Sequence, residues 1–441
     1  MGHGHGHGHG HGPAAPASAR VRRILLFLLL PCVLATVVGA LLLYPFGHDQ
    51  RTGADLGLHQ TAVRGEVTAV AQRSCVAQSV QVGTPQPDDP NAKKCATVTV
   101  AMSDGPAGGS SVDTLVPLEP TTPRFAVGDK VVLNYTGGDA HDGRSYQVVD
   151  FQRSLPLGVL AILFALAVLV LGRWQGLAAL GALVLSFVVL LGFVLPSILA
   201  GKDPLTVAVV GAGLIMFVVL YLTHGLSART STAVLGTLLS LGLIGGLGWG
   251  FAAVSRLTGL DEDTANLVGL LGHGIDTRGL LLAGMMIGAL GVLDDVTVTQ
   301  TSAVWELRRA NSELSWRELY AAGLRIGRDH VSSAVNTLVM AYAGAALPVL
   351  LTFAVSGRNL GEILTAQNVA QEIVRTLVGS IGLVAAVPIT TALAAWVASR
   401  EKLPTTKPAV AQLDDDPVTG PIIGLAEVVA RPQPEPRRPR R

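Results

Sequence analysis

Long apolar runs separated by short polar connections make up most of this chain. The first run extends from Ile24 to Tyr44, and seven more follow from Leu155 onward, near 155–171, 176–197, 204–223, 232–254, 279–306, 331–355 and 373–397. A helix of about 20 apolar residues crosses a hydrocarbon core of about 30 Å. The pattern predicts an α-helical polytopic membrane protein with about eight transmembrane helices: an anchor (24–44) and a seven-helix membrane domain (155–397). The apolar part of 261–278 is too short to span and fits either a re-entrant or an interfacial helix.

Residues 48–153 have a different hydrophobic pattern. Apolar and polar residues alternate in short runs at 64–71, 95–102, 131–135 and 146–151, with Gly, Pro, Asn and Asp between them. Such alternation between turn residues is typical of β-strands. The segment Phe125–Leu133 fits a turn that leads into a strand. We expect a small β-rich domain, a barrel or a sandwich, between the first and second transmembrane helices.

Composition agrees with a membrane protein. Hydrophobic residues make up 49% of the chain and charged residues only 14%, against about 25% charged residues in a typical soluble domain. The net charge of +1 gives no field that would attract nucleic acid. The sequence also lacks the Walker, zinc-protease, nucleophile-elbow and dinucleotide motifs, which argues against an ATP-driven pump and against the common hydrolases.

The distribution of Lys and Arg predicts the orientation. Basic residues gather before the anchor, in the connection 307–329 and in the tail ending Arg440–Arg441, whereas the opposite connections carry few. The positive-inside rule therefore places both termini in the cytoplasm and the β-rich domain outside. The His/Gly-rich segment 1–23 and the Pro-rich tail 402–441 should be disordered cytoplasmic segments. The His–Gly run is either a purification tag or a native tail.

Two cysteines, Cys75 and Cys95, lie in the domain expected outside the cytoplasm. An oxidising compartment permits a disulfide between them. The alternative is a pair of free thiols that lie too far apart to bridge.

The run 279–306 carries the strongest candidate chemistry. At 100° per residue, one stripe about 60° wide holds Gly284, Gly288, Gly291, Asp295, Thr299, Ser302 and Glu306, with Asp294 beside it. Glycines admit a neighbouring helix at close range. An ionised Asp near the membrane centre costs roughly 2.5–3.5 kcal/mol, so it usually serves a function. Carboxylate and hydroxyl oxygens suit protons and hard cations. These oxygens form a transport or ion-binding site, or else a hydrogen-bond network that fixes packing; for Glu306, an ordinary position at the membrane interface is the alternative.

Two later runs add candidates. Asn336 lies deep in 331–355 and either lines a site or packs. Glu372 and Arg375 are three residues apart on a helix and fit an interfacial ion pair. Gly379 and Gly382 share their face and fit helix packing.

The segments Asp329–Gly344 and Glu372–Leu383, together with Gly291–Ser302, resemble the YibE/F family of bacterial multi-pass membrane proteins. The resemblance extends roughly over 60–400. It implies a permease-like protein in the bacterial cell (plasma) membrane, with a β-rich domain outside.

The sequence thus favours a transporter that moves, or is coupled to, a cation or proton through a polar seam among the last three spans. Two alternatives stay open: a membrane scaffold or envelope sensor whose outer domain binds a partner, and an intramembrane enzyme acting on a lipid-linked substrate. A non-enzymatic role is favoured. The expected partners are the lipid bilayer and a small ion or solute, and a second copy of the chain or an envelope protein also fits. The sequence identifies neither a metal nor a cofactor.

The orientation gives the first testable prediction. In a background without other cysteines, an impermeant thiol reagent added outside the cell should label Asp139→Cys and leave Asn311→Cys unlabelled, because the positive-inside rule puts the two positions on opposite sides. Labelling of Asn311→Cys without labelling of Asp139→Cys would overturn the predicted orientation.

Overall fold

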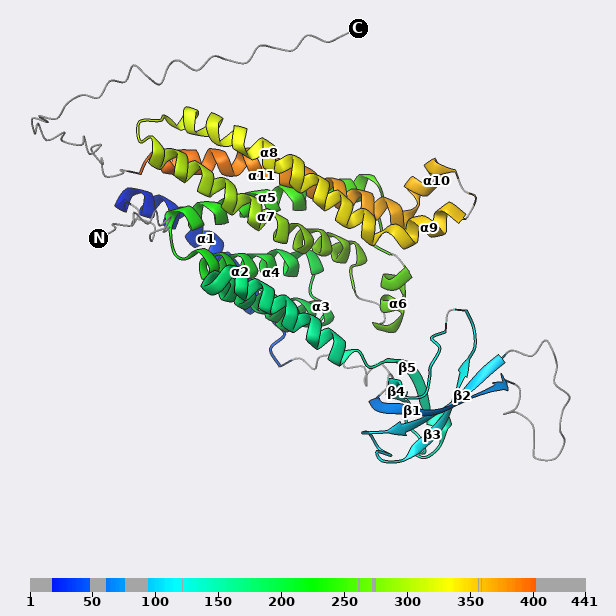
Figure 1. Cartoon of the computed structure of the whole chain (residues 1–441). Coiled ribbons are helices and arrows are strands. Elements are labelled where there is room, and N and C mark those ends of the chain that lie inside the picture. Colours follow the sequence, from blue (N-terminus) through cyan, green and yellow to red (C-terminus); the bar gives the residue numbers. More distant parts are fainter. Residues whose placement is uncertain are drawn as a thin grey trace, which may run out of the picture. The chain divides into compact units, whose positions relative to one another are not determined.

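The computed structural model describes residues 18–47, 61–75, 94–120, 122–260, 262–271, 275–355, 357 and 359–401. The tail 402–441 and most of the predicted N-terminal segment 1–23 lie outside the described residues. The described chain is mostly helical, with one small curled sheet (Figure 1).

Six helical segments are long and apolar enough to cross a membrane, so the chain is a helical membrane protein. Within the described residues they are α1 (Ala19–Leu43), the continuous segment Ser154–Leu199, α4 (Pro204–His224), α5 (Ala228–Val254), α7 (Thr277–Ala310) and α11 (Gln367–Ala398). Helix α1 begins at Ala19 rather than at Ile24, so the arginines preceding the predicted anchor belong to the helix.

The segment Ser154–Leu199 contains α2 (Ser154–Val189), a π-helical turn η3 (Leu190–Val194) and α3 (Leu195–Leu199). Arg173 interrupts α2 with a φ of 50°, and a Cβ on Gly176 would collide with the carbonyl oxygen of Val168. Residues eight apart in a straight helix are separated by about 12 Å. The chain therefore turns back at Arg173, between the two spans that the hydrophobic pattern predicts at 155–171 and 176–197.

The connection predicted at 307–329 is much shorter in the structure. Helix α7 continues to Ala310, and only five residues separate it from α8 (Trp316–Ala345). Ser315 caps α8 by accepting from the backbone N–H of Glu318, and its own N–H and hydroxyl donate to the Glu318 carboxylate. These bonds hold the pKa of Glu318 below its ordinary value.

The region expected as one span at 331–355 is divided between α8 and α9 (Leu347–Val355). It is not among the six apolar segments, because α8 carries many polar residues. Two other short helices are α6 (Glu262–Leu271), which at ten residues is too short to span, and α10 (Leu360–Thr365).

The bundle is built around α7, which contacts α4, α5, α8 and α11. Small residues set the close approaches: Gly382 of α11 lies against Ile244 of α5, and Gly236 of α5 lies against Thr390 of α11, so that a Cβ at either glycine would collide with its neighbour. The first helix is packed in the same way, because Thr36 of α1 lies against Gly213 of α4. Small residues at such positions allow the van der Waals contact that holds helices together in lipid.

The β-rich region is a five-stranded antiparallel sheet in the order β3-β2-β1-β4-β5. The strands are β1 (Thr61–Ser74), β2 (Lys94–Met102), β3 (Ser111–Pro117), β4 (Lys130–Tyr135) and β5 (Tyr146–Phe151). The sheet curls until its edges meet, and Thr114 of β3 donates to the carbonyl oxygen of Tyr146 of β5 over 3.1 Å. One face encloses a core that includes Val63, Val98 and Leu133.

Strand β3 is absent from the sequence prediction, although Val112, Thr114 and Val116 alternate inward along it. The predicted turn before β4 is present, with Gly128 at a φ of 93°.

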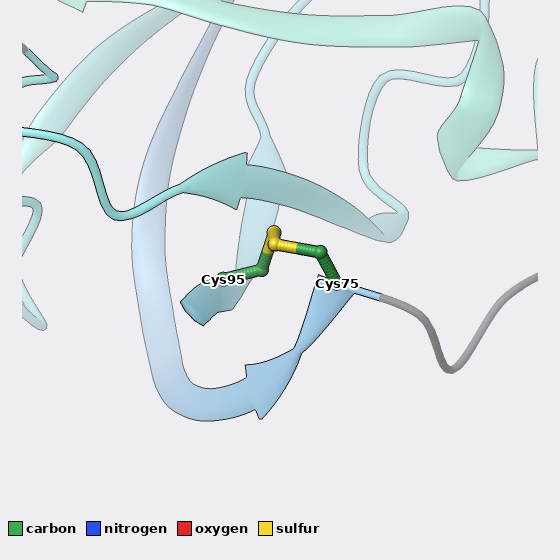
Figure 2. Close-up of a disulfide and its surroundings, with 2 residues drawn as sticks. All are labelled: Cys75 and Cys95. Carbon is green, nitrogen blue, oxygen red and sulfur yellow. A yellow bond between two sulfur atoms is a disulfide. The ribbon is translucent and has the colours of Figure 1, made fainter. Parts of the chain in front are cut away.

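Cys75 and Cys95 form a disulfide between the end of β1 and the start of β2 (Figure 2). Their Cα atoms are 5.1 Å apart, within the range that a bridge requires. The bond closes a loop with a sequence separation of 20 residues, which in the chain-entropy model stabilises the folded domain by about 3 kcal/mol.

Removal of this bridge gives the second prediction. In the full-length protein, Cys75→Ser together with Cys95→Ser should speed the slowest amide hydrogen exchange in β1 and β2 by about a hundredfold, since about 3 kcal/mol of opening free energy is lost. Cys32→Ser is the control, because Cys32 is a free thiol on α1. Equal exchange rates in the double variant and the control would show that the bridge does not stabilise the sheet.

Candidate functional site

A layer of buried polar side chains lies inside the bundle. Thr297 of α7 and Thr237 of α5 share a hydrogen bond of 2.8 Å between their hydroxyls. One turn further along α7, Gln300 donates to the carbonyl oxygen of Gly323 over 2.6 Å and to the hydroxyl of Thr391 over 2.8 Å. Gln300 is only 3% exposed. These bonds join α5, α7, α8 and α11, and they hold the helices together where no water reaches.

Glycines make room for this layer on α8. A Cβ on Gly327 would lie 2.7 Å from the side-chain oxygen Oε1 of Gln300, and one on Gly323 would lie 2.8 Å from the Val304 side chain. Gly323 and Gly327 are four residues apart, so they share one face of α8. The basic residues of the same helix, such as Arg325 and Arg328, are exposed.

A cavity of about 470 Å³ lies beside this layer, between α2, α4 and α7. Its polar lining comes from Gln175 and Ser186 of α2, Thr223 and His224 of α4, and Asp294 of α7. The second half of α2 supplies its residues because the chain turns back at Arg173. The cavity lies near the C-terminal end of α4, since Thr223 and His224 form that helix's last turn.

Asp294 is the acidic group of this cavity. Its side chain is partly buried, and the Oδ1 atom is fully buried without a hydrogen-bond partner among the described residues. The Nδ1 atom of His224 lies 2.8 Å from the Thr223 hydroxyl, which leaves the other ring nitrogen for another partner. A carboxylate oxygen, an imidazole, an amide and hydroxyls therefore converge on one space. Such groups can accept, hold and pass a proton or coordinate a cation.

Asp295 occupies the neighbouring face. It is exposed on α7 and interacts electrostatically with both Asp294 and His224. The rest of its predicted stripe shares this exposure: Gly284, Gly288, Gly291 and Thr299 are exposed, and Ser302 is partly buried. A Cβ on Gly284 or Gly291 would meet no atom within 4 Å, and one on Gly288 would meet only the Tyr342 hydroxyl. Within the described chain these three glycines thus lie on an open face, unlike Gly382.

The remaining predicted site residues lie away from the cavity. Glu306 is 54% exposed and pairs with Arg309 at 3.1 Å and with Arg229 at 3.6 Å. Asn336 is exposed on α8. Glu372 and Arg375 form an ion pair within α11, and a Cβ on Gly379 would lie 3.8 Å from the Leu338 side chain. The structure therefore groups Asp294 with α2 and α4 rather than with the last two spans.

Gln175 lines the cavity although the sequence does not single it out, whereas His224 begins a connection, 224–230, that in the sequence fits a helix cap, a gate or an ordinary turn. Gln175 comes two residues after Arg173, where the chain turns back, and nothing in the local hydrophobic pattern marks it. Within the described residues, no three His, Cys, Asp or Glu side chains form a group suited to a metal ion.

Fold and site together define a multi-pass helical membrane protein with a polar cavity at the edge of its bundle. The family model of the YibE/F-like proteins matches residues 160–400, so the chain belongs to the YibE/F-like family. The match covers the helices that follow the β-rich domain and includes neither that domain nor α1. Comparisons with curated proteins and with solved structures found no match.

The buried layer gives the third prediction. Gln300→Leu should lower the free energy of unfolding by about 1–2 kcal/mol, because two hydrogen bonds in the membrane interior are lost. The shift can be measured as a lower midpoint in a denaturing-detergent titration. Thr299→Val is the matched control on the exposed face of the same helix turn. Equal midpoints for the two variants would mean that the layer does not stabilise the bundle.

Proposed function

We propose that this protein is a permease that moves, or is coupled to, a proton or another small cation, and that Asp294 is the ion-binding group. The observation that carries the proposal is the buried, unpartnered Oδ1 atom of Asp294, which belongs to a side chain lining a cavity of about 470 Å³. A membrane protein that places a carboxylate inside its bundle usually uses it for ion or proton passage.

The chemistry of the lining favours a proton. A single carboxylate oxygen beside an imidazole can exchange a proton without a full coordination shell, whereas hard metal cations take six or more oxygen ligands. His224 lies at the end of α4, close to the exposed turn 225–227, which offers a route between the cavity and one side of the membrane. Asp295, exposed beside the cavity, adds a negative charge that attracts cations.

The membrane in question is the bacterial plasma membrane, with both termini in the cytoplasm and the β-rich domain outside. About eight crossings follow if the two halves of Ser154–Leu199 and the α8–α9 region each span. Alternating exposure of Asp294 to the two sides requires α2 and α4 to move relative to α7.

The two other functions fit the site less well. A scaffold has no need of an unpartnered buried carboxylate, since removing such a group stabilises a purely structural core. An enzyme on a lipid-linked substrate needs a cluster of catalytic groups beside a lipid-sized groove, whereas one carboxylate and one imidazole line this cavity of about 470 Å³.

The fourth prediction tests the role of Asp294. In vesicles reconstituted with the full-length protein and loaded with a pH-sensitive dye, Asp294→Asn should reduce proton flux at least tenfold, because the amide cannot bind and release a proton. Folding should remain intact, because Asn is nearly the same size and can still form hydrogen bonds. Elution volume and thermal midpoint in detergent check this.

Glu313→Gln is the control, because it neutralises a carboxylate in the exposed turn between α7 and α8. Its flux should equal that of the parent protein. Full flux in Asp294→Asn would show that Asp294 is structural. A parent protein that carries neither protons nor Na⁺ nor K⁺ above empty vesicles would contradict transport of these ions.

A further inference from the structure

A second and larger cavity, of about 650 Å³, lies at the N-terminal end of α11. It is formed by α8, α9, α10 and the first turns of α11, far along the chain from Asp294. Figure 1 shows α9 and α10 as two short helices near that end of α11. Its polar lining consists of Tyr342, Asn368, Gln371, Glu372, Arg375 and Thr376.

Two of these polar side chains lack the partners that burial demands. Gln371 is 3% exposed, and its Nε2 atom has no hydrogen-bond partner among the described residues. Arg375 uses Nη1 in its ion pair with Glu372, while its buried Nε atom is likewise unpartnered. A buried donor without an acceptor costs free energy comparable to a lost hydrogen bond. Two such donors lining one cavity indicate that an acceptor-rich group binds there.

The rest of the cavity wall is apolar. Val339, Leu350 and Leu364 contribute to it, and Leu350 and Leu364 also remain exposed at the surface. Leu347 and Leu360 extend this exposed apolar surface next to the cavity. A molecule that fits must therefore combine an apolar body with a polar end.

The position of the cavity along α11 indicates which class of ligand can reach it. Helix α11 has 32 residues and is about 48 Å long, against a hydrocarbon core of about 30 Å. Gln371–Arg375 lie within its first nine residues, so they reach the level of lipid headgroups. Trp396 and Arg400, a stacked pair suited to the opposite interface, lie at the other end of the helix.

We propose that this cavity binds a zwitterionic phospholipid of the phosphatidylethanolamine type, with its headgroup among Gln371, Glu372 and Arg375. The phosphate accepts from the two unpartnered donors, since guanidinium and amide N–H groups suit phosphate oxygens. The ammonium group lies against the Glu372 carboxylate. The part of one acyl chain nearest the headgroup lies against the apolar wall of the cavity. The lipid enters the cavity laterally, from the surrounding bilayer.

The test measures lipid binding to the full-length protein in maltoside detergent by native mass spectrometry. The probe is dioleoyl phosphatidylethanolamine. Dioleoyl phosphatidylglycerol keeps the phosphate and lacks the ammonium, and glycerophosphoethanolamine keeps the headgroup and lacks the chains. We expect one bound phosphatidylethanolamine, with phosphatidylglycerol binding about tenfold more weakly and glycerophosphoethanolamine not binding at the same concentrations.

The key variant is Gln371→Met. It removes an unpartnered donor and keeps the volume, so the thermal midpoint without added lipid should not fall. Phosphatidylethanolamine affinity should drop about tenfold, as the loss of one hydrogen bond to a charged group predicts. Arg375→Gln should weaken binding at least as much. Arg400→Gln, at the opposite end of α11, is the matched control and should bind like the parent.

Three results would each overturn the proposal. The first is unchanged phosphatidylethanolamine affinity in Gln371→Met. This variant leaves the Glu372–Arg375 ion pair in place, so its folding does not depend on the loss of that pair. The second is equal binding of both phospholipids, which would remove the role of Glu372. The third is binding of glycerophosphoethanolamine as tight as that of the full lipid, which would assign the cavity to a water-soluble zwitterion. None of these results depends on ion flux through the Asp294 cavity.

Discussion

The structure depends on how closely α5, α7, α8 and α11 can approach one another. In lipid there is little hydrophobic force between helices, so contact must come from small residues and interhelical hydrogen bonds. Gly382 is the small residue that lets α11 lie close to Ile244 of α5. Gln300 makes the interhelical hydrogen bonds, to Gly323 of α8 and Thr391 of α11. This arrangement fixes the face of α7 that is buried, and with it the direction in which Asp294 points.

The buried polar groups fall into two kinds. Thr237 and Thr297 bond each other inside the bundle, and Gln300 bonds Gly323 and Thr391, so these groups join the helices. Asp294 Oδ1 and Gln371 Nε2 have no partner in the described chain, and each side chain lines a cavity at the edge of that bundle. In a medium without water an unsatisfied group is expensive. Unpartnered groups that also line a cavity, as Asp294 and Gln371 do, are therefore where a ligand or a proton belongs.

Helix α8 illustrates why a high density of Lys and Arg does not by itself mark a loop in a membrane protein. Its arginines suggest a cytoplasmic connection, yet Leu319, Gly323 and Gly327 are buried against the neighbouring helices. The helix is amphipathic, with its basic residues on the exposed side. A linear count of Lys and Arg does not distinguish a polar loop from a packed helix with one polar face.

The sequence by itself determined the class of protein, the positions of the six apolar helical segments, four of the five described strands and the family, because these depend on composition and on local periodicity. It also singled out Asp294, since an acid in an apolar run is costly wherever it points. Only the tertiary structure decided that Asp294 faces α2 and α4, that Asp295 and its glycines lie on an open face, and that His224 belongs to the site. The reason is physical: periodicity fixes which residues share a helix face, whereas the neighbour of that face is set by packing between helices far apart in the chain.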